Sequence, residues 1–147
     1  MRVLLDTSLL IAASVEGHPA HAEALGWLQR VKGRADEGLV AADALAEMYA
    51  VLTTLPVRPR IPPAIALQLI QENVLEACEV VYPSGEDYRS LIQHLADSGI
   101  IGGATYDALL LHVAWKARVD RVVTLNPTDF RRAYSPLADR IISPLEG

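Results

Sequence analysis

Short apolar segments recur along the chain, and segments with the periodicity of helices separate them. The apolar segments span residues 3–5, 39–42, 79–82 and 121–125, and a last extended piece spans residues 140–143. The helical patterns span residues 8–15, 20–31, 44–55, 64–74 and 106–118, with a further one after Gly85. Short buried strands that alternate with helices are typical of βαβ units. We therefore predict an α/β fold, a three-layer α/β/α sandwich around a central, mainly parallel sheet of four to five strands.

Two of these helical patterns follow a residue that is suited to an N-cap. Asp43 precedes the pattern at 44–55, and Thr105 precedes the pattern at 106–118. Asp and Thr oxygens accept hydrogen bonds from the free N–H groups of a first helical turn, so we expect both residues to cap their helices. The helix after Gly85 should place its large apolar residues on one face; they are Tyr88, Leu91, Ile92 and Leu95.

The length and composition suit one domain over residues 1–147. The chain has 147 residues, 51% of them hydrophobic, which is enough for one buried core. It contains no apolar run long enough to cross a membrane and no N-terminal pattern of a secretion signal, so we expect a cytoplasmic protein without a membrane segment. Cys78 is the only cysteine, which excludes an internal disulfide and a thiolate metal cluster, and its apolar neighbours predict a buried thiol.

The net charge limits how the protein can meet nucleic acid. The chain carries 13 Lys and Arg against 18 Asp and Glu, a formal charge of −5. This balance argues against sequence-blind coating of nucleic acid by the whole surface. A local site remains possible, because acids that converge on a divalent cation have their charge largely neutralised there.

Four acidic residues occur where apolar strands end or where apolar helices begin. Asp6 follows the first strand, Asp129 follows the strand at 121–125, and Glu47 and Asp107 lie early in apolar helices. The carboxyl ends of parallel strands share one edge of a sheet, where α/β proteins bind ligands. Asp6 alone is equally consistent with a helix cap. Four carboxylates together would repel one another without a cation, and their oxygens suit Mg²⁺ or Mn²⁺, so the set predicts metal-assisted phosphodiester hydrolysis.

The segments around these acids resemble the motifs of a known family. LLDTS, ALAEMYAVL, YDALLLHVA and TLNPTDF occur in the order and spacing of the PIN domain motifs, across essentially the whole chain. In size and in the TLNPTDF ending, the chain is most similar to the VapC-type toxins of bacterial and archaeal toxin–antitoxin pairs. The resemblance implies a PIN-like sandwich and a ribonuclease that uses Mg²⁺ or Mn²⁺.

The resemblance also assigns roles to residues of the site. It implies that Asp6 and Asp107 are the principal metal ligands, with Glu47 as the third acid and Asp129 as the fourth. Hydroxyl support is expected from Thr7 or Ser8 together with Thr124. Many PIN domains carry an acid where this chain has Asn126. Asn126 is therefore the alternative to Asp129, as a neutral ligand or a residue that positions water.

The implied function is that of an endoribonuclease toxin that a small VapB-type antitoxin restrains. A homodimer is expected, because VapC-type relatives pair and the segments 20–31 and 44–55 carry more apolar residues than one sheet face obviously covers. The alternatives are a catalytically silent PIN-like interaction module and a nuclease directed at DNA. A haloacid-dehalogenase-like phosphatase is excluded because Ser8 stands where its second Asp is needed. A P-loop or dinucleotide-binding fold is excluded because residues 6–12 contain no glycine.

Overall fold

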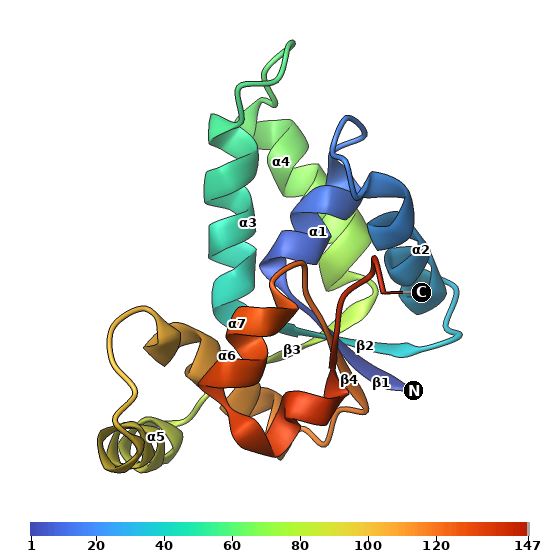
Figure 1. The fold of residues 1–147 in the computed structure, drawn as a ribbon. Helices are drawn as coiled ribbons and strands as arrows, with labels where there is room; N and C mark the ends of the chain where they lie inside the picture. The colour runs from blue at the N-terminus through green and yellow to red at the C-terminus, as the bar shows by residue number, and fades with distance from the viewer. Residues whose placement is uncertain (147) are drawn as a thin grey trace.

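The computed structural model describes residues 1–146 and contains a sheet of five parallel strands (Figure 1). Along the sheet the order is β3-β2-β1-β4-β5. The strands are β1 (Arg2–Leu5), β2 (Glu37–Ala41), β3 (Cys78–Val81), β4 (Arg121–Val123) and β5 (Ile141–Ile142). The order reverses at β1, so the carboxyl ends of β1 and β4 adjoin the switch point where ligands bind in open α/β sheets. The predicted parallel sheet is confirmed, with 140–143 supplying its edge strand.

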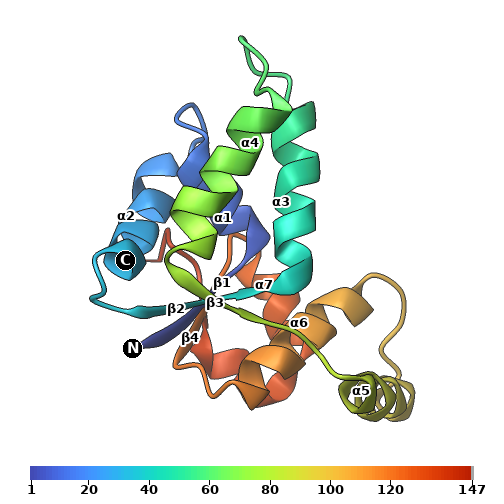
Figure 2. The same ribbon diagram turned by 180° about the vertical axis from the view of Figure 1, so that it is seen from behind.

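Helices cover both faces of the sheet, which makes the three predicted layers (Figures 1 and 2). One layer holds α1 (Thr7–Ser14), α2 (His21–Lys32), α3 (Ala42–Thr54) and α4 (Pro63–Ile70), which continues into a π-helical segment, η1 (Gln71–Leu75). The other holds α5 (Gly85–Ser98), α6 (Ala104–Lys116), α7 (Pro127–Ala133) and a 3-10 segment, η2 (Ser135–Arg140). Within residues 1–146 no helix has the length and apolar character that crossing a membrane requires.

Side chains of β1 alternate between two buried cores. Val3 and Leu5 pack with α1 to α4, whereas Leu4 packs with α5, α6 and α7 on the other face. All three are fully buried, which explains why this strand is apolar without alternation. Cys78 is buried as predicted, and burial raises the pKa of its thiol to about 11.

Two local predictions, both about helix caps, are wrong. Asp43 lies in the first turn of α3, whose N-cap residue is Ala41, and Thr105 lies inside α6, whose N-cap residue is Gly103. Neither N-cap residue has a side-chain oxygen to offer, because each helix starts earlier than its polar residue suggests. In α5, Leu91 and Leu95 are buried but Tyr88 and Ile92 are exposed, so the apolar face is only partly covered.

Candidate active site

Asp6 occupies the junction between β1 and α1. Its backbone N–H donates to the carbonyl of Val123 at 3.1 Å, which extends the pairing of β1 with β4 by one residue. Asp6 is the N-cap residue of α1 by position, yet its carboxylate makes no capping hydrogen bond. Helix capping therefore does not account for this acid.

Two hydroxyl groups hold the Asp6 carboxylate instead. Ser8 Oγ donates to Asp6 Oδ2 at 2.8 Å, and Thr124 Oγ1 donates to the same oxygen at 2.9 Å. Each hydroxyl oxygen in turn accepts a backbone N–H, Ser8 from Leu125 at 3.0 Å and Thr124 from Asn126 at 3.1 Å. Because the accepted bonds leave each hydroxyl hydrogen free to donate, the network points both hydrogens at Asp6. It ties the end of β1 to the segment after β4 and fixes the carboxylate.

Glu47 comes from α3 and reaches the same region. Thr7 Oγ1 donates to Glu47 Oε2 at 3.1 Å, and Thr7 itself is buried at the start of α1. Thr7 and Ser8 thus support different acids, Glu47 and Asp6. Asp43 lies one helical turn before Glu47 and lines the same pocket. The i, i+4 spacing of these two acids was the sequence signal that could have identified Asp43 as a residue of the site.

Asp107 lies in the first turn of α6 among like charges. Burial and the neighbouring carboxylates of Asp6, Asp129 and Glu47, in that order of effect, raise the pKa of Asp107 above its ordinary value. Acids from three helices and one strand end therefore act on one another at the carboxyl edge of the sheet. The four acids that the sequence singled out are brought together.

These side chains line an open pocket of about 370 Å³. Its polar wall is formed by Asp6, Thr7, Ser8, His18, Asp43, Glu47, Asp107 and Asn126, and its apolar wall includes Ile11, Val51, Leu110 and Leu125. The two candidates for the last position are both exposed; Asn126 lines the pocket, whereas Asp129, in the first turn of α7, lies outside the described lining and acts on the pKa of Asp107 through its charge.

The donor set of this pocket matches the oxygen preference of Mg²⁺ and Mn²⁺. Within residues 1–146, no three His, Cys, Asp or Glu side chains form a ready-made metal cage. Mg²⁺ does not need one, because it commonly keeps several waters and takes only one or two protein carboxylates. A cation would also relieve the repulsion that raises the pKa of Asp107. The residues therefore fit a hydrated divalent cation, and hydrogen bonds from Ser8 and Thr124 hold the Asp6 carboxylate in one orientation.

Sequence reasoning missed two further residues of the pocket. His18 lines the pocket and is half-buried, and its Nδ1 accepts the N–H of Ala20 at 3.1 Å, which places the proton of the neutral ring on Nε2. Tyr106 precedes Asp107 and lines the pocket while it stays exposed. A position next to a predicted ligand was the available signal for Tyr106; for His18, in a loop, there was none.

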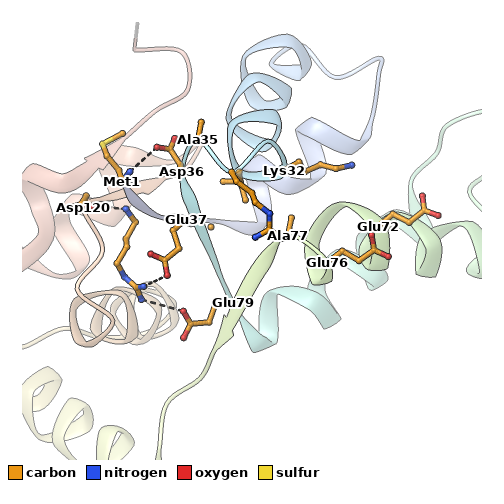
Figure 3. A pocket seen from close by; sticks show the side chains of 14 residues that line it. Met1, Lys32, Ala35, Asp36, Glu37, Glu72, Glu76, Ala77, Glu79 and Asp120 are labelled. Carbon is orange, nitrogen blue, oxygen red and sulfur yellow. Dashed lines mark hydrogen bonds and ion pairs between the residues drawn. The ribbon is translucent and has the colours of Figure 1, made fainter.

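A larger pocket of about 600 Å³ lies at the opposite edge of the sheet, where the strands begin (Figure 3). Some of its charged groups form ion pairs, among them the N-terminal ammonium with Asp36 at 3.1 Å. Arg2 pairs with Glu37 and also with Glu79, the latter at 3.6 Å. Arg30 donates to Asp36 at 2.6 Å and, as the main cause, holds the pKa of that carboxyl below its ordinary value. These contacts join strand ends and loops.

Comparisons with known proteins agree with this architecture. A PIN domain family model matches residues 3–136. Ribonuclease VapC40 of Mycobacterium tuberculosis is 38% identical over 112 residues, which cover 71% of this chain and 72% of that protein. A structure of FitAB bound to an IR36 DNA fragment is similar with a TM-score of 0.70 at 16% identity, over 99% of this chain and 96% of that chain. VapBC2 from Rickettsia felis, bound to a DNA fragment from its promoter, is similar with a TM-score of 0.63 at 18% identity, over 97% and 98% of the two chains. The chain belongs to the PIN domain family.

Proposed function

We propose that this protein is a divalent-metal-dependent endoribonuclease, the toxin of a VapC-type toxin–antitoxin pair that acts in the cytoplasm. The observation that carries the proposal is that Asp6, Glu47 and Asp107 line one pocket at the carboxyl edge of the sheet, where burial and then the neighbouring carboxylates raise the pKa of Asp107. Such a group of acids is costly to assemble unless a cation compensates it. The similarity to Ribonuclease VapC40 supports RNA as the substrate.

In this proposal Asp6 and Asp107 hold Mg²⁺ or Mn²⁺, with Glu47 and Asp129 completing the negative site. The bound cation supplies activation of water and stabilisation of phosphoryl oxygens. Ser8 and Thr124 keep the Asp6 carboxylate in one orientation through their bonds to Oδ2, and preorganisation of this kind lowers the reorganisation that binding needs.

Thr7 has the matching positioning role for Glu47, through the bond to Oε2. Asn126 and Asp129 divide the last position. We assign the charged role at the last position to Asp129, because its carboxylate contributes to the raised pKa of Asp107. We propose that Asn126, which lines the pocket, contacts water or substrate.

The proposed partners are a small VapB-type antitoxin and a second copy of the chain. Exposed apolar side chains that a partner would cover lie on α3 and α4, at Tyr49, Ile65 and Leu67. Exposed apolar residues were expected on the segments 20–31 and 44–55, which correspond to α2 and α3. Among residues 1–146, none of the large exposed apolar side chains lies on α2, so of these two helices only α3 carries one. We call the pocket lined by Asp6, Glu47 and Asp107 the acid pocket. An antitoxin arginine would bind carboxylates of the acid pocket bidentately, which couples antitoxin binding to inhibition.

The test of the activity is cleavage of a single-stranded RNA with Mg²⁺, with Mn²⁺ and with excess EDTA, beside single-stranded DNA of the same sequence. We expect cleavage of RNA with either metal and none with EDTA. Asp6→Asn should abolish most cleavage, whereas Asp97→Asn makes the same charge change on α5, outside the pocket lining, and should preserve it. Undiminished cleavage in EDTA would contradict the metal, and cleavage of DNA alone would contradict the substrate.

The test of the partners is light scattering on the purified protein, together with co-expression of the protein and the small protein encoded by the neighbouring gene. We expect a dimer at micromolar concentration and relief of growth arrest on co-expression. A monomer under these conditions would contradict the dimer, and persistent arrest would contradict the antitoxin.

A further inference from the structure

Tyr106 presents an aromatic ring to solvent at the wall of the acid pocket. The residue lies in the first turn of α6, directly before Asp107, and 74% of its surface is exposed. The chain has other strongly exposed aromatic side chains, at Tyr49, Tyr82, Tyr88 and Trp115. Among residues 1–146, Tyr106 is the one of this exposed group that lines the acid pocket.

The rest of the pocket is not uniformly polar. Beside the acids it is lined by Ile11, Val51, Leu110 and Leu125, so a ligand there meets both carboxylates and apolar side chains. Its volume of about 370 Å³ is near the lower end of small-ligand pockets, which suits one nucleotide unit better than a stretch of paired strand. A nucleotide has the corresponding two parts, a phosphate that approaches a cation and a flat base that prefers apolar or aromatic contact.

We propose that Tyr106 is a substrate-positioning residue that stacks against an unpaired nucleobase next to the phosphodiester bond that is cleaved. This inference rests on the proposed ribonuclease function and names a residue that would hold its substrate. A base inside a duplex already has a neighbour on each face, whereas an unpaired base can offer a face to an aromatic side chain. Because every base has such a face, the contact by itself selects strandedness more than sequence.

The exposure of Tyr106 makes a purely structural role small. A surface side chain that packs on little contributes little to stability when it is truncated. Tyr106 and Asp107 line the same pocket, so a base held on the ring would lie close to the acids without any change in the fold. Tyr82 offers a matched control, because it is 72% exposed and lines a different pocket, beside β3.

The experiment measures binding of a labelled single-stranded oligoribonucleotide by fluorescence anisotropy, with Mg²⁺ present and in the cleavage-deficient Asp6→Asn background. Adding Tyr106→Ala should weaken binding about 5- to 100-fold, the range that stacking of one base on an aromatic ring supports. Tyr106→Phe should retain binding, and Tyr82→Ala should leave it unchanged. A fully paired duplex of the same sequence should bind weakly and equally to the proteins with and without Tyr106.

Kinetics on the protein with Asp6 intact give a second readout. Tyr106→Ala should raise KM for single-stranded RNA more than it lowers kcat, because the stacked base is held in both the ground state and the transition state. Unchanged thermal stability of Tyr106→Ala would separate this effect from misfolding.

The outcomes separate this inference from the proposed function. Efficient cleavage by Tyr106→Ala with unchanged binding and KM would overturn the stacking role and leave the ribonuclease intact. RNA binding that depends on Tyr106, in a protein that cleaves no RNA, would support stacking and contradict the ribonuclease. If Tyr106→Ala weakens binding of the antitoxin alone, the residue belongs to a protein interface and the inference is wrong.

Discussion

Asp87 is an acid that the structure assigns to stability, and Asp87→Ala should lower the thermal midpoint of unfolding. The residue lies in the first turn of α5 and is only 7% exposed. Its carboxylate accepts the N–H of Ser84 at 2.8 Å and the ammonium of Lys116 at 2.7 Å, while Ser84 Oγ accepts the Asp87 N–H at 3.1 Å. These bonds form a capping box at the start of α5 and join that helix to α6.

The size of the loss follows from these contacts. The bond from the Ser84 N–H contributes roughly 1 kcal/mol. The bond from Lys116 is charge-assisted, but the lysine side chain is half-exposed, so solvent reduces its contribution to about 1–2 kcal/mol. Together they predict a loss of about 2–3 kcal/mol, or about 5–10 °C in the midpoint for a domain of this size. The neighbouring Glu86→Ala is the matched control, because that side chain is highly exposed, and it should change stability by less than about 0.5 kcal/mol.

The pH dependence of stability tests the contribution of the Asp87 carboxylate independently. The bonds from Lys116 and the Ser84 backbone, in that order, hold the pKa of Asp87 well below its ordinary value of 3.8. A carboxyl whose pKa is lowered by folding stabilises the protein above the unfolded pKa and loses that contribution as the pH falls through the folded pKa. The difference between the original protein and Asp87→Ala should therefore be full at neutral pH and shrink below about pH 4. Thermal melts from pH 7 to pH 3 measure it, and a difference independent of pH, or matched by Glu86→Ala, would refute this reasoning.

Three further predictions concern the site and the thiol. Asp107→Asn should lower cleavage at least about 100-fold and should melt at a higher temperature than the unmodified protein in EDTA, since burial and three acids disfavour the charge of Asp107. Saturating Mg²⁺ should raise the thermal midpoint of the unmodified protein only, by roughly 5–10 °C at 100 times the dissociation constant. Equal shifts in the two proteins would contradict Asp107 as a metal ligand. Calorimetric titration should show that Asp129→Asn weakens Mg²⁺ binding more than Asn126→Ala, and the reverse ranking would place the last ligand at Asn126. Cys78, whose burial raises the pKa of its thiol to about 11, should react with a thiol reagent only on unfolding, so rapid labelling of the folded protein would contradict its burial.

The sheet was predictable from sequence because its strands are buried on both faces. Val3, Leu4 and Leu5 contact two different cores, so the strand shows no polar alternation and is recognised by its apolar run and the polar residues that end it. The two cap predictions failed because the start of a helix depends on the backbone at the junction. Ala41 has extended dihedrals at the end of β2, and α3 begins directly after it, before Asp43.

Tyr88 and Tyr106 show a second limit of sequence patterns. Both aromatic residues lie at helical spacing from a buried residue, Tyr88 from Leu91 and Tyr106 from Val113, and periodicity alone places them with the core. Their exposure depends on which other segments reach that side of the helix, which is a tertiary property. The acids were easier to find because an ionised group in an apolar segment conflicts with its surroundings and demands a partner.

Position in the first turn of a helix does not separate a structural acid from a functional one. Asp87 and Asp107 both occupy such turns, yet Ser84 stands three residues before Asp87 as a capping partner and Ala104 stands three residues before Asp107. Their environments shift the two pKa values in opposite directions: the ammonium of Lys116 and the N–H of Ser84 lower that of Asp87, whereas burial and then three carboxylates raise that of Asp107. A carboxylate whose pKa folding lowers is already stabilised in its charged form, while one whose pKa folding raises would be stabilised in that form by a bound cation. That difference, beyond the presence of acids, supports our proposal that the carboxyl edge of the sheet holds the active site.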